Sequence, residues 1–188
     1  MKNLIIMTGM SGSGKSVALE AIEDMGYFCI DNLPPILIPK VIELMDSSDG
    51  KMSKLAIGID LRGKEFFHDL IEQLDILSNN KDFVLRILFL DTADERLVSR
   101  YKETRRAHPL GGSVSLLDAI RQERKILDDL KGRSSKVIDT TDISPKELRD
   151  ILFSLYSGGR EEFFVVNVLS FGFKHGIPID ADLMFDVR

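Results

Sequence analysis

The chain has 188 residues, 44% of them hydrophobic and 29% charged, which is the composition of an ordinary globular protein with one main core. Its formal net charge of −5 argues against a uniformly basic surface for nucleic acid. No apolar run is long enough for a membrane span, and the single cysteine, Cys29, excludes an intrachain disulfide. We therefore expect a cytoplasmic protein in which Cys29 is a buried thiol.

Apolar runs that end in small or acidic residues alternate with helical patterns over residues 1–156. The runs predict strands at residues 4–7, 27–31, 55–60, 84–91 and 136–139. The period of the apolar residues predicts helices over residues 16–25, 36–45, 64–77, 95–103, 116–131 and 147–156. This alternation is typical of an α/β fold with a mostly parallel sheet, helices on both faces and ligands at the carboxyl ends of the strands.

Two of the predicted helices begin with the signature of a capping box. Thr92 stands three residues before Glu95, and Ser144 stands three residues before Glu147 with Pro145 between them. In each case we expect the hydroxyl and the carboxylate to satisfy backbone N–H groups at the start of the helix.

The stretch GMSGSGKS, residues 9–16, lies between the first predicted strand and the first predicted helix. It fits G-x-x-x-x-G-K-[ST], a loop whose backbone N–H groups surround nucleotide phosphates. We expect Lys15 to reach the outer phosphates and Ser16 to ligate Mg²⁺, while the helix start favours the anion. The sequence therefore predicts a P-loop NTPase-like fold whose nucleotide contacts are Gly9, Met10, Ser11, Gly12, Ser13, Gly14, Lys15 and Ser16.

Magnesium also needs a carboxylate at the end of a strand, acting directly or through water. Asp31, Asp60 and Asp91 all end apolar runs. DLRG, residues 60–63, also fits a D-x-x-G pattern for the metal and the γ-phosphate, although DLKG at 129–132 fits it at a predicted helix end. We predict that Asp60 holds Mg²⁺, with Asp31 as the alternative, and that Asp60 and Lys15 are catalytic. The same motif adds three nucleotide contacts: Leu61, Arg62 and Gly63.

A basic stretch follows the fourth predicted strand. Residues 100–136 hold 10 Lys or Arg against 5 Asp or Glu, a local excess of positive charge in an acidic chain. Arg100, Arg105 and Arg106 precede a break that contains Pro109 and two glycines. Because arginine pairs well with phosphate, three interpretations stay open: a solvated helical face, a lid that closes over phosphates, and a surface for RNA.

A linker and the start of a second unit follow the last predicted helix. Ser157, Gly158 and Gly159 break the helical pattern, and a new apolar run, FFVVNVLSFGF, begins after Glu162. We expect a nucleotide-binding domain over residues 1–156, a linker over 157–162, and the beginning of a C-terminal domain over 163–188, in a chain truncated within that domain.

Several stretches together resemble the RapZ/YvcJ family of nucleotide-binding proteins. They are GMSGSGKS, YFCIDNLPP, DLRG, FLDTADERLVSRYKETRRAHPL and SFGFKHGIPIDADLMFDVR, and they span nearly the whole chain. The resemblance implies an N-terminal P-loop domain that binds and hydrolyses ATP and GTP through residues 9–16 and 60–63. It also implies a C-terminal domain that, in some members, binds small RNA, senses an amino-sugar phosphate and presents RNA to a ribonuclease. Family chains are longer than this one.

Three functions compete for these residues. The first is a slow ATP- and GTP-hydrolysing switch with Mg²⁺, in which the γ-phosphate orders residues 60–63 and the segment with Arg105 and Arg106. The second is a small-metabolite P-loop kinase, because DNLPP, residues 31–35, stands where such kinases often meet the acceptor. The third is a nucleic-acid-binding module that uses the basic stretch. The oligomeric state stays open, and use of GTP depends on the resemblance alone, since no N-K-x-D guanine motif occurs.

Overall fold

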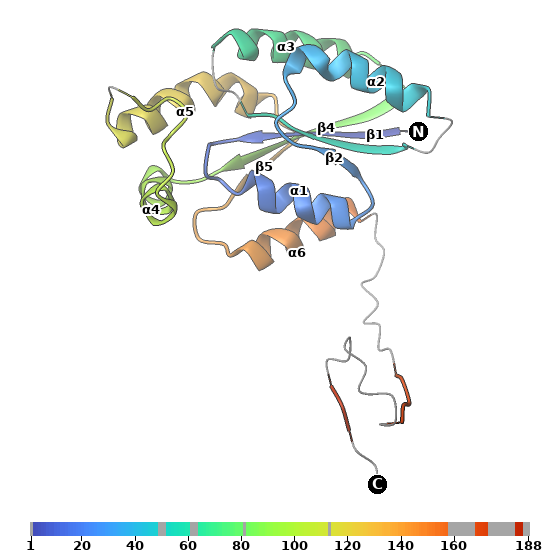
Figure 1. The fold of residues 1–188 in the computed structure, drawn as a ribbon. Helices are drawn as coiled ribbons and strands as arrows, with labels where there is room; N and C mark the ends of the chain where they lie inside the picture. The colour runs from blue at the N-terminus through green and yellow to red at the C-terminus, as the bar shows by residue number, and fades with distance from the viewer. Residues whose placement is uncertain are drawn as a thin grey trace.

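The computed structural model describes residues 2–48, 52–60, 64–80, 82–112, 114–157, 168–172 and 183–185, and of residues 64–66 the backbone alone. Its centre is a five-stranded parallel sheet with the strand order β2-β3-β1-β4-β5 (Figure 1). The strands are β1 (Lys2–Gly9), β2 (Phe28–Ile30), β3 (Lys54–Gly58), β4 (Phe83–Asp91) and β5 (Lys136–Asp139). All five predicted strands are therefore confirmed, and all run in the same direction, so their carboxyl ends meet at one edge.

Helices lie on both faces of the sheet, as predicted. They are α1 (Lys15–Asp24), α2 (Ile38–Asp46) after the short 3₁₀ turn η1 (Pro35–Leu37), α3 (Lys64–Ser78), α4 (Asp94–Thr104), α5 (Leu116–Gly132) and α6 (Pro145–Tyr156). Helices α1 and α6 cover one face, and α2 and α3 cover the other (Figure 1). Helices α4 and α5 lie beside the carboxyl edge of the sheet, where the loop between β1 and α1 turns back.

The sheet is buried on both faces, which explains why its strands are continuous apolar runs. On β1, Leu4 and Ile6 belong to the core under α2, α3 and α5, whereas Ile5 and Met7 belong to the core under α1 and α6. All four side chains are fully buried. Alternate residues of one strand therefore join two separate cores, and β1 is the shared wall between them.

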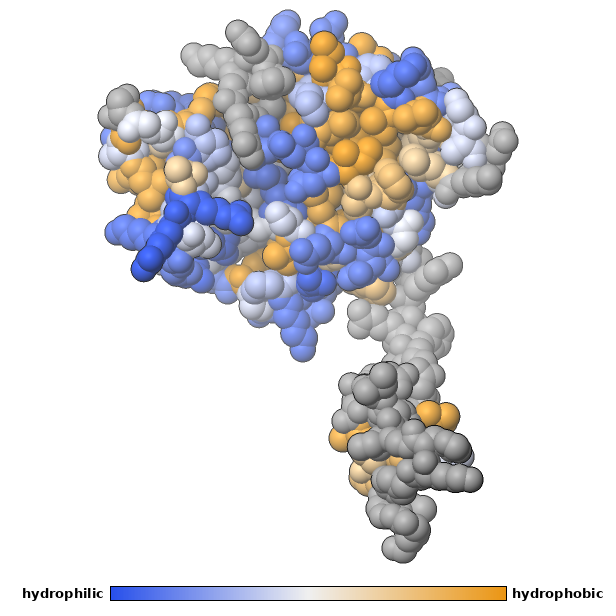
Figure 2. All heavy atoms as spheres, in the orientation of Figure 1, coloured by the Kyte–Doolittle hydropathy of each residue, from blue (hydrophilic) through white to orange (hydrophobic). Residues whose placement is uncertain are grey.

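Helix α2 is amphipathic and leaves an apolar surface exposed. Figure 2 shows apolar side chains gathered over η1 and α2, where Ile36 and Leu37 of η1 and Leu44 of α2 are exposed. The opposite side of the helix packs into the core through Ile38, Ile42 and Met45.

One of the two predicted capping boxes is confirmed, and the other is wrong. Ser144 and Glu147 satisfy each other's backbone N–H groups at the start of α6. Helix α4 instead starts after Ala93, with no side-chain cap, because the Thr92 hydroxyl bonds to the carbonyl of Asp91 and to Thr140. A tertiary contact has taken the hydroxyl that the local pattern assigned to the helix.

Cys29 lies on β2, which is a short edge strand, and it is half-buried rather than fully buried as expected. Its Sγ stands 3.5 Å from the carbonyl oxygen of Leu19. Burial, followed by the nearby charge of Glu23, raises the pKa of this thiol to about 11. At neutral pH Cys29 is therefore a protonated, weakly reactive thiol.

In the part of the chain that the structure describes, no helix is long and apolar enough to span a membrane. Residues 168–172 and 183–185 carry no regular secondary structure, and the rest of the expected C-terminal unit lies outside the described residues.

Candidate functional site

Three glycines of the loop between β1 and α1 have positive φ: Gly9, Gly12 and Gly14. Gly9 has φ +139°, and a Cβ atom there would stand 2.1 Å from the carbonyl oxygen of Leu90 on β4. Gly14, the N-cap of α1, is left-handed with φ +103°. The loop can therefore lie against β4 and enter the helix within a few residues, which brings the N–H groups of the first turn of α1 to the carboxyl edge of the sheet.

Lys15 folds back over this loop. Its Nζ donates hydrogen bonds to the carbonyl oxygens of Gly9, at 2.9 Å, and Met10, at 3.1 Å. The same atom stands 3.8 Å from Oδ1 of Asp60, which follows β3. The side chains of Lys15 and Asp60 are 14% and 21% exposed, so the pair is accessible from solvent. The structure thus brings together the two residues predicted to be catalytic.

The residues predicted to hold Mg²⁺ offer hard oxygen donors of the kind that this ion prefers. Ser16 is exposed on the first turn of α1, and the Asp60 carboxylate lies beside Lys15. Among the described residues, no cluster of three or more His, Cys, Asp or Glu could hold a metal alone. One hydroxyl and one carboxylate fit an ion that takes its remaining ligands from phosphates and water. Leu61, Arg62 and Gly63 lie outside the described residues.

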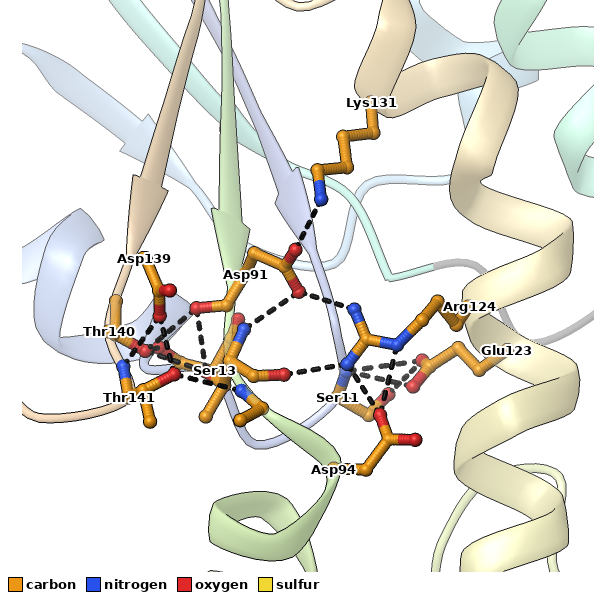
Figure 3. Close-up of polar contacts among 12 residues, drawn as sticks. Ser11, Ser13, Asp91, Asp94, Glu123, Arg124, Lys131, Asp139, Thr140 and Thr141 are labelled. Atoms are coloured by element: carbon orange, nitrogen blue, oxygen red, sulfur yellow. Dashed lines mark hydrogen bonds and ion pairs between the residues drawn. The ribbon is translucent and has the colours of Figure 1, made fainter.

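Of the other two aspartates that end strands, Asp91 is bound by two basic side chains of α5. Asp91 accepts hydrogen bonds from Arg124 at 2.7 Å and Lys131 at 2.6 Å (Figure 3). Burial by itself would raise the pKa of Asp91, but these hydrogen bonds outweigh it and hold the pKa below its ordinary value. Asp31 is exposed and adjoins Gly58, where an added Cβ would stand 2.7 Å from its Oδ1. Asp31 therefore stays the alternative to Asp60, and Asp91 does not.

Three consecutive residues of the loop form hydrogen bonds with residues far away in the sequence. The N–H of Ser11 donates to both oxygens of Glu123 at 3.1 Å, and its hydroxyl donates to Oε1 at 2.5 Å (Figure 3). The carbonyl of Gly12 accepts from Arg100 at 3.0 Å. The carbonyl of Ser13 accepts from the hydroxyl of Thr140 at 2.8 Å. Helices α4 and α5 and the end of β5 therefore all contribute to the conformation of the loop.

Arg100 of α4 bridges the loop and the residue that follows β5. Its guanidinium donates to the carbonyl of Thr140 at 2.6 Å as well as to Gly12. Burial, together with the charge of Arg96, lowers the pKa of Arg100 from its ordinary value. Arg105 and Arg106 lie beyond the end of α4 and are exposed, and Arg105 is left-handed with φ +52°.

The basic excess of residues 100–136 is partly consumed within the fold. Arg124 donates to Asp94 at 2.7 and 2.9 Å in addition to Asp91, and it thereby ties α5 to the start of α4 (Figure 3). Lys131 pairs with Asp91, and Arg100 binds backbone carbonyls. The free positive surface is therefore smaller than the composition of the stretch indicates.

A buried polar cluster that was not predicted from the sequence lies beside the loop. Glu123 is 3% exposed, and its Oε2 stands 3.2 Å from Nε2 of His108, which is 5% exposed. The ring of Tyr101 packs on that of His108 with centroids 5.2 Å apart. A signal was present, since Glu123 occupies one position of the buried stripe of α5. The other buried residues of α5 are Ala119, Ile120, Leu127 and Leu130.

A parallel sheet with a G-x-x-x-x-G-K-S loop between its first strand and first helix defines a P-loop NTPase-like α/β fold. Comparison with protein families places the chain more narrowly. Residues 2–160 match the RapZ-like N-terminal domain, and residues 164–188 match the RapZ C-terminal domain. The chain belongs to the RapZ-like family.

Curated relatives agree with this assignment. A nucleotide-binding protein of Bacillus cereus strain AH187 is 59% identical over 185 residues, which cover 98% of this chain and 63% of that protein. A nucleotide-binding protein of Macrococcus caseolyticus is 54% identical over 187 residues, which cover 100% of this chain and 62% of that protein. The chain therefore spans a little under two thirds of the length of these relatives.

Solved structures share the fold at low sequence identity. A sugar kinase of Janibacter sp. HTCC2649 superposes with a TM-score of 0.54 at 20% identity, covering 82% of this chain and 94% of that one. A shikimate kinase from Acinetobacter baumannii has a TM-score of 0.51 at 17% identity, covering 86% and 97%. These similarities establish the P-loop kinase-like fold.

Proposed function

We propose that this chain binds Mg²⁺-ATP or Mg²⁺-GTP at residues 9–16 and hydrolyses the nucleotide slowly, as a regulatory switch. The observation that carries the proposal is the position of Lys15, whose Nζ crosses the loop to Gly9 and stands 3.8 Å from Asp60. In loops of this pattern the lysine binds the outer phosphates. The relatives from Bacillus and Macrococcus are named nucleotide-binding proteins, which supports the choice of ligand. Use of both ATP and GTP rests on the family resemblance.

The proposed chemistry is stabilisation of charge on the phosphoryl group. Lys15 and the N–H groups at the start of α1 would face the negative charge that develops as the bond between the γ-phosphorus and the oxygen bridging to the β-phosphate breaks. Ser16 and Asp60 are the residues that would hold Mg²⁺, which neutralises phosphate charge when bound. We assign no general base for the attacking water, and a slow rate is part of the proposal.

The proposed regulatory output comes from the segments around the site. We propose that the γ-phosphate holds residues 60–63 and the arginine segment, residues 105–112, in one arrangement, and that hydrolysis releases them. Arg105 and Arg106 are exposed, which leaves them available to a partner. In line with the family, we propose that the longer protein acts in the cytoplasm and passes this signal to a small RNA and a ribonuclease.

Phosphate release from Mg²⁺-ATP and Mg²⁺-GTP tests the proposal, with Lys15→Ala beside the unchanged chain. Lys125→Ala is the matched control, because Lys125 is an exposed lysine of α5. Slow release that needs no acceptor, is lost in Lys15→Ala and persists in Lys125→Ala supports the switch. Failure of the unchanged chain to bind either nucleotide would contradict it.

A small-metabolite kinase is the second candidate, favoured by the position of Asp31. This exposed carboxylate adjoins Gly58 on β3, two residues before Asp60. Two proteins that share the fold are named as a sugar kinase and a shikimate kinase. Adding a small-metabolite extract to the same assay separates the candidates. A large increase in nucleotide consumption, with the phosphate found on a metabolite and lost in Asp31→Asn, would favour the kinase over the switch.

A further inference from the structure

We propose that Glu123 is a positioning residue that holds Ser11 of the nucleotide loop and couples the loop, through His108, to the arginine segment. This inference rests on the proposed function, because it concerns how nucleotide at residues 9–16 affects a segment that the phosphates need not touch. Three observations carry it: the buried carboxylate, its set of hydrogen-bond donors, and the two-sided attachment of the arginine segment to the loop.

The carboxylate of Glu123 is buried and matched to its surroundings. Its two oxygens accept the N–H and the hydroxyl of Ser11, and Oε2 also stands 3.2 Å from Nε2 of His108. Removing a carboxylate from water is unfavourable unless donors replace the water, and a buried charge therefore favours the conformation that keeps its donors in place. Glu123 thus selects one conformation of Ser11, in the middle of the phosphate loop.

His108 relays this contact to the arginine segment. Its Nδ1 accepts the N–H of Leu110 at 3.1 Å, so the proton assigned to Nε2 is directed at Glu123. Its carbonyl oxygen accepts the N–H of Gly111 at 2.8 Å. The turn that follows Arg105 and Arg106 is therefore built on His108, which is anchored in turn on Glu123.

The segment is also attached on its other side, through Tyr101 of α4. An added Cβ on Gly12 would stand 3.4 Å from the Tyr101 ring, so this ring packs against the loop. Burial is the main cause that raises the pKa of Tyr101 to about 12, and the charge of Glu123 raises it further. A hydrogen bond with Ser11 has the opposite, smaller effect on this pKa. Arg105 and Arg106 thus lie in the sequence between Tyr101, which packs against the loop at Gly12, and His108, which reaches the loop through Glu123. A shift of the loop on nucleotide binding would therefore move this segment or break one of these contacts.

Hydrogen exchange with and without Mg²⁺-ATP tests the coupling on the 188-residue chain. In the unchanged chain we expect ATP to slow amide exchange across residues 105–112. Glu123→Gln keeps the shape of the side chain but replaces one acceptor oxygen with an NH₂ group. That group cannot accept the hydrogen bonds that Ser11 and His108 donate. We expect it to weaken ATP binding about tenfold and to abolish the slowing, within the usual range of coupling between sites. Asp128→Asn removes one exposed carboxylate from the same helix and should behave like the unchanged chain.

His108→Asn keeps the proposal testable if Glu123→Gln does not fold. It leaves the bonds between Ser11 and Glu123 in place, so ATP should bind within about threefold of the unchanged chain while the slowing at residues 105–112 is lost. ATP binding with no change at residues 105–112 overturns both the coupling and the proposed regulatory output, but leaves the proposed nucleotide binding and hydrolysis intact. A full change in both variants overturns the coupling through Glu123 and His108 alone. Absence of ATP and GTP binding by the unchanged chain overturns both.

Discussion

Nζ of Lys15, at the start of α1, lies 3.8 Å from Oδ1 of Asp60, beyond the end of β3. Strands β1 and β3 are parallel neighbours in the sheet, so their carboxyl ends bring the ammonium and the carboxylate to one point. Both side chains are partly exposed, and the ammonium also bonds to two loop carbonyls. In the proposed function, a phosphate group that enters the loop would therefore compete with the Asp60 carboxylate for Lys15.

Lys15→Ala should lower the rate of nucleotide hydrolysis by about 100-fold or more, because one donor to the developing charge is lost. Binding of ATP and GTP should weaken as well, since in the proposed function the ammonium would also face the ground-state phosphates. The measurements are single-turnover phosphate release and titration with a fluorescent nucleotide analogue. Unchanged hydrolysis in the variant would mean that the activity belongs to another site or to a contaminant.

Asp60→Asn should raise the Mg²⁺ concentration needed for half-maximal hydrolysis by about tenfold, as expected when a group that orients the metal loses its charge. Asp31→Asn is the matched comparison, because Asp31 is the alternative strand-end carboxylate. Titration of phosphate release against Mg²⁺ distinguishes them. The opposite pattern, with the shift in Asp31→Asn alone, would transfer the metal role to Asp31.

The strands, the helices and the loop could be predicted because each depends on residues close together in the sequence. The phosphate loop is predicted by a local motif that contains Gly9, Gly14 and Lys15. The start of α6 is predicted by Ser144 and Glu147, which form its capping box. Continuous apolar runs indicated a sheet covered on both faces, and the two cores on either side of β1 confirm it.

The support of the loop could not be predicted, because its partners are far apart in the sequence. Ser11 and Glu123 are separated by 112 positions, and Thr140 and Ser13 by 127. Thr92 illustrates the same limit from the other side, since a hydroxyl that fits a local cap is bound to Thr140 instead. Periodicity shows which face of α5 is buried, but it does not show that a carboxylate on that face meets a loop.

Asp91→Asn should destabilise the fold by about 2 kcal/mol at pH 7, because Arg124 and Lys131 lose a charged acceptor. The folded-state pKa of Asp91 is lowered, so its contribution is present above its unfolded pKa and is lost as the pH falls through the folded value. Urea unfolding from pH 7 down to pH 3 should show the difference between the two proteins shrinking toward the acid end. Asp128→Asn should be nearly neutral throughout, and a constant difference would contradict the ionic origin of the effect.

Cys29 should react with iodoacetamide at pH 8 about 100-fold more slowly in the folded chain than in urea. The thiolate is the reactive form, and a rise of the pKa from 9.0 to about 11 lowers its fraction by that factor. The unfolded chain is its own control, because the same thiol is then in water. Equal rates in the two states would mean that β2 opens readily at the edge of the sheet.

Gly9→Ala should destabilise the fold by about 3 kcal/mol or more, a loss typical of strained backbone combined with overpacking. The new Cβ would stand 2.1 Å from the carbonyl oxygen of Leu90 on β4, and the residue would keep an unfavourable positive φ. Gly132→Ala is the matched control, because a Cβ at the end of α5 meets no atom within 4 Å. It should change stability by no more than about 0.5 kcal/mol, in the stabilising direction. Urea unfolding measures both variants, and a mild effect of Gly9→Ala would show that β1 and the loop can separate from β4 without loss of the fold.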